Sequence, residues 1–260
     1  MIMRRFHFAA LTAVAVFGFA SAASAADWPV RASPLNAARA YDWTGFYIGG
    51  NLGGSWANND ATYFQPLFLG SGTASFNQAS VIGGGQVGYN WQFGATVLGA
   101  EADFDARHWS GSATVAPFVG VPTFLVNLTQ EENWLSTVRG RIGFTYGNAL
   151  LYGTGGVAFG ETQHSYTEFV TTNAAQVRTL SDSTTKTGWA VGAGVEYAIW
   201  KEVPGKVSLG IEYLYVDLGD TTLSQGTSTA GGLTFSPSQA TFNDRWSIVR
   251  AKLNWRFFSN

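Results

Sequence analysis

Acidic and basic residues recur at alternate positions in several segments of this chain. Glu101 and Asp103 stand two residues apart, and so do Arg139 and Arg141. Side chains two residues apart lie on one face of a β-strand, so each pair would present its charges together. Carboxylates facing guanidinium groups can form charge-assisted hydrogen bonds or line a charged pore. The nine charged residues that we assign to such a shared face are Glu101, Asp103, Arg139, Arg141, Glu196, Glu212, Arg250, Lys252 and Arg256.

Two histidines suggest a different kind of chemistry, catalysis or haem binding. His108 stands close to Ser110, and His164 directly precedes Ser165. A histidine beside a hydroxyl group could act in a surface hydrolase or acyltransferase, and two histidines could bind haem. No motif places a carboxylate to orient either imidazole, so we interpret both histidines as solvated loop residues. We predict no catalytic, cofactor or metal site.

The charged residues fall within eight segments of period-two alternation that are rich in glycine and aromatic residues. Such alternation is typical of β-strands with two different faces. Gly accounts for 32 of the 260 residues, and aromatic residues make up 15%. After the N-terminus, no segment has the roughly 18 uninterrupted apolar residues of a membrane-spanning helix. The eight segments run over residues 43–56, 80–92, 96–108, 132–146, 149–161, 187–200, 206–218 and 245–258.

The connections between these segments alternate in length. Short links around Gly94, Gly147-Asn148 and Pro204-Gly205 alternate with four long polar stretches. Bacterial transmembrane barrels have such short periplasmic turns and long extracellular loops. We therefore predict an all-β fold, an eight-stranded antiparallel up-and-down transmembrane barrel, with a soluble lipocalin-like barrel as the alternative. The long stretches, which we expect to be extracellular loops, are Ala57–Ala79, Trp109–Glu131, Thr162–Lys186 and Gly219–Asp244.

The two faces of each segment differ in chemistry. In the last segment, Val249, Leu253 and Trp255 oppose Arg250 and Lys252. A transmembrane barrel turns its apolar face outward, and aromatic residues form girdles where the barrel meets the membrane interfaces. Aromatic residues do gather near the segment ends. The girdle that we expect consists of Trp43, Trp56, Tyr89, Trp91, Tyr146, Tyr197, Trp200, Tyr213, Tyr215, Trp246 and Trp255.

With the apolar face outward, the charged residues would fill the lumen. We expect Glu101 and Asp103 to lie beside Arg139 and Arg141 of the neighbouring segment. We expect Glu196 and Glu212 to lie near Arg250 and Lys252. Buried charges are costly when unpaired and tolerable when paired and hydrogen-bonded. Because eight strands leave a lumen just wide enough for side chains, this pattern favours a plug over the charged eyelet of a pore.

The N-terminus has the three parts of a secretory signal peptide. Arg4 and Arg5 precede a short apolar run, and Ala23-Ser24-Ala25 has the form of a cleavage site. We predict a cleaved signal peptide over residues 1–25, a periplasmic linker over 26–41 and an outer-membrane barrel over 42–260. The net charge of −2 provides no basic field that would recruit nucleic acid.

Glycine-rich motifs recur in every predicted strand. They include Trp43-Thr44-Gly45-Phe46-Tyr47-Ile48-Gly49-Gly50, Gly84-Gly85-Gln86-Val87-Gly88-Tyr89-Asn90, Arg139-Gly140-Arg141-Ile142-Gly143 and Gly188-Trp189-Ala190-Val191-Gly192-Ala193-Gly194-Val195-Glu196. In the order and spacing of these motifs, the chain resembles the small porin-like outer-membrane β-barrel family of alphaproteobacteria, to which outer-membrane proteins of Brucella and rhizobia belong. The resemblance implies an outer-membrane barrel with a structural role, and it links some family members to permeation or surface binding.

We therefore expect an integral outer-membrane protein of a Gram-negative cell envelope, with a role in envelope integrity and surface display and with a lumen plugged by salt bridges. The alternatives are a narrow porin-like diffusion channel for small solutes, and a surface haem binder or enzyme that uses the loop histidines. The expected partners are outer-membrane lipid, lipopolysaccharide and the barrel-assembly machinery, and nucleic acid is not among them.

Overall fold

The structure is a computed structural model, and it describes residues 41–57, 59–65, 70–76, 79–116, 124–170, 175–200, 205–230, 233–235 and 237–257. The signal peptide expected at residues 1–25 and all but the last residue of the linker expected at 26–41 lie outside these ranges. In the part of the chain that the structure describes, no helix is long and apolar enough to cross a membrane.

Antiparallel strands account for most of the described residues. Period-two alternation and an abundance of Thr, Val and aromatic residues favour this conformation along nearly the whole chain. The strands are β1 (Gly45–Ala57), β2 (Asn59–Gln65), β3 (Gly70–Phe76), β4 (Ala79–Phe93), β5 (Thr96–Val115), β6 (Phe124–Tyr146), β7 (Ala149–Val170), β8 (Ala175–Trp200), β9 (Lys206–Gln225), β10 (Ser228–Ala230), β11 (Leu233–Phe235) and β12 (Ser238–Phe257).

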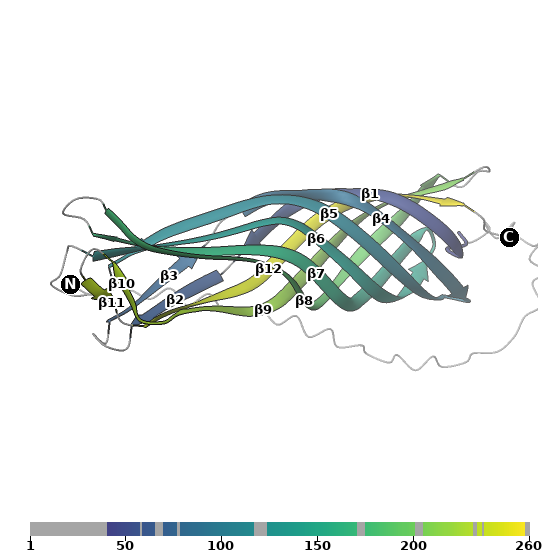
Figure 1. Ribbon diagram of the computed structural model, residues 1–260. Coiled ribbons are helices and arrows are strands. Elements are labelled where there is room, and N and C mark those ends of the chain that lie inside the picture. The colour runs from purple at the N-terminus through teal and green to yellow at the C-terminus, as the bar shows by residue number, and fades with distance from the viewer. Residues whose placement is uncertain are drawn as a thin grey trace, which may run out of the picture. The chain divides into compact units, whose positions relative to one another are not determined.

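Eight of these strands form a closed ring (Figure 1). Its order is β1-β4-β5-β6-β7-β8-β9-β12, and β12 returns to pair with β1 from Phe46↔Phe257 to Ala57↔Trp246. Each strand is antiparallel to its neighbours in the ring, and neighbours in the ring follow one another along the chain. Closure removes the unpaired edges that an open sheet would leave in a membrane. The prediction of an eight-stranded up-and-down barrel is confirmed.

Tight turns connect β4 to β5 and β6 to β7 at one end of the ring. Gly94 and Gly147 lie in these turns at φ of 62° and 59°, a left-handed conformation that glycine adopts without a steric cost. Both turns lie where the sequence predicted short links. Of the third predicted link, Gly205 is described and Pro204 lies outside the described residues.

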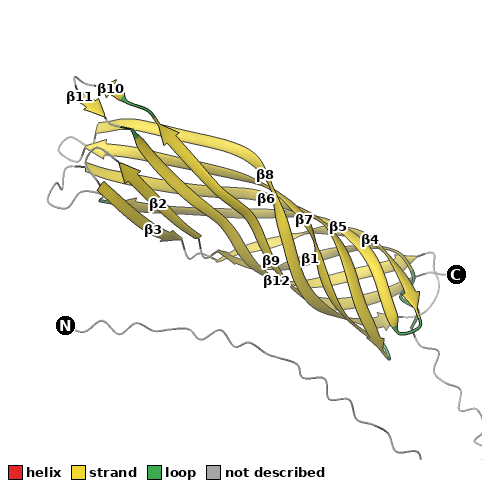
Figure 2. Ribbon diagram, turned by 90° about the horizontal axis from the view of Figure 1, so that it is seen from below, coloured by secondary structure: helices red, strands yellow, loops and turns green. Residues whose placement is uncertain are grey.

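The prediction of four long loops at the other end is wrong. β2, β3 and the outer parts of β5, β6, β7, β8, β9 and β12 occupy much of these stretches, and the strands extend far past the predicted segment ends (Figure 2). β2 continues the line of β1 and pairs with β12, while β3 pairs with β2. The alternation persists through these stretches, but Ser and Thr replace the apolar residues on its outer face, and such a polar composition is also typical of loops.

We divide the barrel into a turn-side half and a loop-side half, with the boundary near Trp56, Trp134 and Ser247. In the turn-side half, the outward side chains are apolar. Leu253 and Trp255 of β12, for example, are 52% and 49% exposed, whereas Arg250 and Lys252 of the same strand point inward and are 1% exposed. This apolar outer band is a surface that a bilayer can cover.

The loop-side half has the opposite arrangement. Gln239 and Thr241 of β12 face outward, and Phe242 and Ile248 are fully buried inside. A continuous apolar core fills this half, as in a soluble β-barrel. Its buried members are Ala57, Ala61, Tyr63, Ala74, Ile82, Val126, Leu128, Leu135, Ala158, Tyr166, Ala190, Leu214, Val216, Leu218, Leu223, Ala240, Phe242, Trp246 and Ile248.

Two residues of the predicted girdle do not lie on the outer surface. Trp43 is 0% exposed, because the chain before β1 folds into the turn-side mouth and the indole stacks on Arg256. Trp246 is 2% exposed, because its position on β12 is in phase with the inward residues, and it packs against Arg107. The members that face outward are Trp56, Tyr89, Trp91, Tyr146, Tyr197, Trp200, Tyr213, Tyr215 and Trp255.

Candidate functional site

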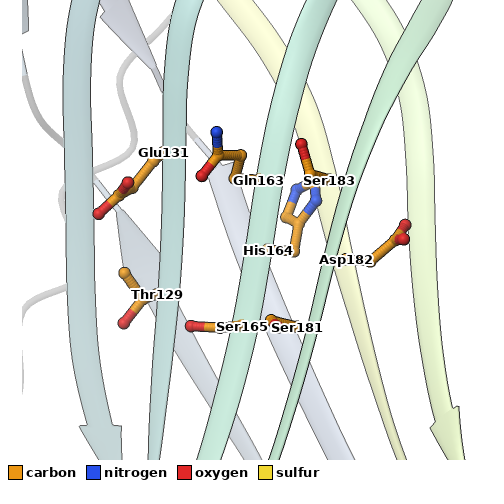
Figure 3. Close-up of a pocket in the computed structure, with 8 residues that line it drawn as sticks. All are labelled: Thr129, Glu131, Gln163, His164, Ser165, Ser181, Asp182 and Ser183. Atoms are coloured by element: carbon orange, nitrogen blue, oxygen red, sulfur yellow. The ribbon is translucent and has the colours of Figure 1, made fainter.

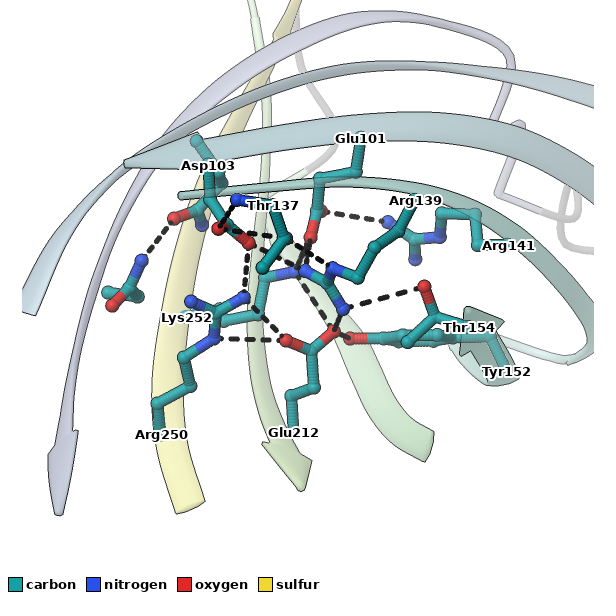
Figure 4. A network of polar contacts seen from close by, with 12 residues as sticks. Glu101, Asp103, Thr137, Arg139, Arg141, Tyr152, Thr154, Glu212, Arg250 and Lys252 are labelled. Atoms are coloured by element: carbon teal, nitrogen blue, oxygen red, sulfur yellow. Dashed lines mark hydrogen bonds and ion pairs between the residues drawn. The ribbon is translucent and has the colours of Figure 1, made fainter. Parts of the chain in front are cut away.

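A layer of ion pairs crosses the lumen of the turn-side half (Figure 4). Its centre is Arg139 on β6, whose Nη2 lies 2.7 Å from Glu101 Oε1 and 2.7 Å from Asp103 Oδ2, both on β5. Nη1 of the same guanidinium lies 3.3 Å from Glu212 Oε1 on β9. One arginine therefore joins carboxylates from opposite parts of the barrel wall.

Two cations on β12 complete this layer from the other side. The Arg250 guanidinium lies 2.6 Å from Asp103, 2.5 Å from Asp105 and 2.8 Å from Glu212. Lys252 Nζ lies 2.6 Å from Glu101 Oε1 and 3.4 Å from Glu212 Oε1. Carboxylates from β5 and β9 thus share cations from β6 and β12, and the contacts form a network rather than separate pairs.

Arg141 extends the network towards the turns. Its Nη2 lies 2.7 Å from Glu196 Oε1, and its Nη1 donates a hydrogen bond of 2.9 Å to the Tyr47 hydroxyl. Tyr47 in turn donates a hydrogen bond of 2.7 Å to Glu101. The guanidinium also lies 4.1 Å from the ring centroid of Tyr152, a cation–π contact in a site shielded from water.

Neutral groups satisfy the remaining acceptors of the layer. Asp103 Oδ1 accepts hydrogen bonds from the Thr137 amide at 3.1 Å and the Thr137 hydroxyl at 2.9 Å. Glu212 accepts another from the Tyr152 hydroxyl at 2.9 Å, and Asp105 accepts one from Asn51 at 2.8 Å. Such additional hydrogen bonds make burial of an ion pair tolerable.

All nine charged residues that the sequence assigned to a shared face are buried, none more than 5% exposed. As expected, Glu101 and Asp103 lie beside Arg139 and Arg141, and Glu212 lies beside Arg250 and Lys252. Glu196 differs from the expectation. It pairs with Arg141 and accepts a hydrogen bond from Ser208, whereas Lys252 pairs with Glu101.

Arg256 is the member of the set that joins no ion pair among the described residues. Its guanidinium lies 4.8 Å from a ring centroid of Trp43 and 5.6 Å from that of Tyr47. Nη1 donates a hydrogen bond of 2.9 Å to the Tyr41 hydroxyl. The arginine is therefore held at the turn-side mouth mainly by aromatic rings.

Several lumen residues were absent from the predicted set. Asp105 is one of them, although it follows Asp103 at the same period of two and lies on the same face. Tyr47, Tyr152, Asn51 and Gln86 also point inward. Their phase along β1, β4 and β7 would have identified them, since each lies an even number of residues from another inward position.

A second buried polar cluster lies in the apolar core of the loop-side half. Arg107 Nη1 lies 2.6 Å from Glu132 Oε2. Asp244 accepts hydrogen bonds from Gln130 at 2.5 Å and from Lys186 at 2.6 Å, and lies 3.1 Å from His164. Burial raises the pKa of Glu132 to about 8, and the Arg107 charge opposes that rise.

The sequence pattern did not reveal this second cluster because β6 is irregular at this point. The register between β6 and β7 shifts between Glu132 and Leu135, as expected where an extra residue enters one strand. Inward positions of β6 are odd-numbered from Leu135 to Arg141 and even-numbered from Glu132 to Val126. A constant period of two therefore places Glu132 on the wrong face.

The interpretation of His164 as a solvated loop residue is wrong. It is 2% exposed and points inward to Asp244, whereas Ser165 next to it faces outward. Successive side chains of a strand point to opposite faces, so these two residues cannot form a nucleophile and base pair. A groove of about 280 Å³ on the outer wall of β6, β7 and β8 is lined by Ser165, Asp182 and neighbouring polar residues (Figure 3).

The side chain of His108 lies outside the described residues. Among the residues that the structure describes, no group of three or more histidine and carboxylate side chains is arranged to hold a metal ion.

Comparisons with known proteins agree with this architecture. The family model of the outer membrane protein beta-barrel domain matches residues 11–243. The chain is 34% identical over 251 residues to the 31 kDa outer-membrane immunogenic protein of Brucella melitensis biotype 1, covering 92% of this chain and 95% of that protein. It is 32% identical over 193 residues to the 22 kDa outer membrane protein of Rhizobium leguminosarum bv. viciae, covering 73% of this chain and 72% of that protein.

Among solved structures, Ail, the attachment invasion locus protein of Yersinia pestis, matches at a TM-score of 0.33 and 12% identity, covering 81% of this chain and 99% of that chain. The resemblance inferred from the glycine-rich motifs is confirmed by the family model and by the relatives from Brucella and Rhizobium. The chain belongs to the outer-membrane protein β-barrel family.

Proposed function

We propose that this protein is a closed outer-membrane barrel that supports the cell envelope and displays its loop-side half outside the cell. The observation that carries the proposal is the ion-pair layer across the lumen. Its cations come from β6 and β12 and its carboxylates from β5 and β9, and every member is nearly inaccessible to solvent. A solute would have to break several buried ion pairs to pass.

The outer surface of the loop-side half supports the display role. It presents polar side chains such as Thr129, Glu131, Gln163 and Ser181 over an apolar core, which suits a structure that stands in water. The Brucella relative is named an immunogenic protein, a description that fits an exposed surface. We expect this half to extend beyond the membrane as paired strands rather than as flexible loops.

The remaining parts of the proposal concern export and partners. We expect a signal peptide over residues 1–25 to be cleaved, and the barrel to contact outer-membrane lipid, lipopolysaccharide and the barrel-assembly machinery. We expect no catalysis and no cofactor. Burial of His164 gives no support to the alternative of a surface enzyme or haem binder that uses exposed histidines.

Conductance measurements test the closed lumen against the narrow porin-like channel. The parent barrel in planar bilayers should show no steady conductance. Arg139→Ala with Arg141→Ala should raise conductance and lower the urea midpoint of unfolding, because Glu101, Asp103 and Glu196 lose partners. Adding Asp103→Asn to that pair should recover part of the stability, because it removes one of the carboxylates that Arg250 and Lys252 would then have to balance. A parent that conducts steadily would refute the plug.

Protease treatment of intact cells tests the orientation. Cleavage should occur between strands within residues 57–79 or 162–186, and the protein should fractionate with the outer membrane. Cleavage at Gly147-Asn148 in intact cells would reverse the orientation. Recovery of the protein in the soluble periplasm would refute the membrane assignment.

A further inference from the structure

Arg256 leaves one edge of its guanidinium without a partner inside the turn-side mouth. The residue is 1% exposed, yet its Nε and Nη2 have no hydrogen-bonding partner among the described residues. A buried donor without an acceptor destabilises the fold, and more so when the donor is charged. Among the described residues of the turn-side half, Arg256 therefore has two adjacent buried donors that lack an acceptor.

The geometry of the guanidinium limits which groups can accept hydrogen bonds from these two nitrogens. Its faces are covered by Trp43 and Tyr47, with ring centroids at 4.8 Å and 5.6 Å, and its Nη1 is used by the Tyr41 hydroxyl at 2.9 Å. The two free nitrogens, Nε and Nη2, lie side by side in the plane of the group. They form the fork that binds two oxygens of one planar carboxylate through parallel hydrogen bonds.

Further unpaired donors and a second cation lie at the same end of the lumen. Trp43 Nε1, Arg141 Nε and Asn254 Nδ2 are buried without partners among the described residues. Lys206 Nζ lies 5.5 Å from the ring centroid of Tyr41, on which Arg256 also stacks, and its side chain is 21% exposed at the mouth. The nearest carboxylate to Lys206 is that of Asp42, at 3.9 Å.

Carboxylates within the network already accept hydrogen bonds from other residues. Glu196 accepts hydrogen bonds from Arg141 at 2.7 Å and from Ser208 at 3.1 Å, and no ion pair joins any described carboxylate to Arg256. Nε and Nη2 of Arg256 therefore have no acceptor among the described carboxylates.

We propose that the turn-side mouth is a binding site for a small carboxylate, held in a bidentate manner by Nε and Nη2 of Arg256 behind Tyr41 and Trp43. Lys206 attracts the anion to the mouth, and the aromatic rings shield the bound group from water. The carboxylate comes either from a free small acid or from the end of a peptide chain, because both present the same two oxygens.

Titration of the purified full-length barrel with ¹³C-formate tests this site. Formate should show saturable line broadening in NMR spectra, and acetate should displace it at constant ionic strength whereas chloride should not. A short peptide with a free C-terminal carboxylate should compete only if the mouth admits a chain end, and its amidated form should not compete. Broadening that does not saturate, or that chloride abolishes equally, would contradict the proposal.

Three variants separate the fork from general electrostatics. Arg256→Gln should weaken formate binding at least tenfold, and Arg256→Lys should do the same while it retains the charge. Arg245→Gln, a surface arginine on the same strand, should bind formate as the parent does. Since Arg256→Lys preserves the cation, it remains informative if Arg256→Gln fails to fold. Unchanged affinity in Arg256→Lys would overturn the bidentate site.

One rival acceptor belongs to the chain itself. Four glycines added after Asn260 would displace the chain's own terminal carboxylate. If this extension raises formate affinity tenfold, the chain's terminus already occupies the fork and the proposal of an external ligand fails. Equal affinity in the extended and parent chains supports the proposal.

Discussion

Strand β12 crosses both halves of the barrel, and its inward side chains change character at Ile248. On the turn side of that residue, Arg250 and Lys252 point inward and Leu253 faces outward. On the loop side, Phe242 points inward and Gln239 faces outward. The backbone pairing with β9 continues through both halves, with one register shift between Asn243 and Arg245.

With the bilayer around the turn-side half, as we propose, the difference follows from the medium that surrounds each half. A bilayer requires an apolar exterior, so polar and charged side chains can only be accommodated inside. Water favours a polar exterior and drives apolar side chains into the core. One ladder of hydrogen bonds is therefore stabilised in two ways, by paired charges in the turn-side half and by apolar burial in the loop-side half.

The largest effect should come from breaking the charge network. Arg250→Ala leaves Asp103, Asp105 and Glu212 short of a buried partner, and it should lower the free energy of unfolding by about 3–5 kcal/mol. Arg245→Ala removes an exposed arginine that pairs with Asp217 at 3.0 Å, so it should cost about 1 kcal/mol or less. Urea titration in one detergent or lipid system measures both. Equal losses in the two variants would show that the network contributes no more than a surface ion pair.

A charge on the outer face should distinguish the two halves next. Leu253→Arg should destabilise the barrel by about 2–4 kcal/mol if the residue lies near the bilayer midplane, because arginine replaces a lipid-facing apolar side chain. Gln239→Arg, at an outward position of the same strand in the loop-side half, should stay within about 0.5 kcal/mol of the parent. Unfolding from lipid vesicles gives both values. Similar tolerance at the two positions would refute the assignment of the bilayer to the turn-side half.

The smallest effect, taken per unit of pH, is a pH dependence that arises in the loop-side core. Because burial raises the pKa of Glu132 from 4.5 to about 8, the folded barrel keeps a proton that the unfolded chain releases. That contribution to stability is fully present below pH 4.5 and is lost as the pH rises towards 8. The slope is at most about 1.4 kcal/mol per pH unit.

Urea titrations between pH 5 and 8 check this effect. Glu132→Gln should flatten the pH dependence, and Glu131→Gln, at the exposed neighbouring position, should leave it unchanged. Parallel pH profiles for the parent and Glu132→Gln would show that Glu132 is ionised in the folded barrel throughout this range.

The turn-side half could be predicted well from the sequence, because two signals coincide there. The alternation of Arg250 and Lys252 with Leu253 indicates both a strand and its two faces, and Gly94 and Gly147 indicate the turns. The eight predicted segments match the turn-side ends of β1, β4, β5, β6, β7, β8, β9 and β12 within a few residues.

The loop-side half could not be predicted in the same way. Its outward positions carry Ser, Thr and Gln, a composition shared by loops and by strands that face water, so periodicity alone does not separate the two. Trp246 was assigned to a membrane girdle because it is aromatic and lies near a segment end, although its phase with Ile248 places it inside. The register shift beside Glu132 depends on the neighbouring strand and leaves no mark in the pattern of one segment.

Spin-label accessibility along the outer face of β12 tests the central claim most directly, since the chain contains no cysteine and single labels need no other change. Labels introduced by Val249→Cys, Leu253→Cys, Gln239→Cys and Thr241→Cys would be compared in lipid vesicles for collisions with oxygen, which partitions into the bilayer, and with a water-soluble nickel complex. Labels at Val249 and Leu253 should favour oxygen, and labels at Gln239 and Thr241 should favour nickel, with the change between Thr241 and Val249. A uniform preference for oxygen along the whole strand, or for nickel, would contradict the division of this barrel into a membrane half with a charged lumen and a water-exposed half with an apolar core.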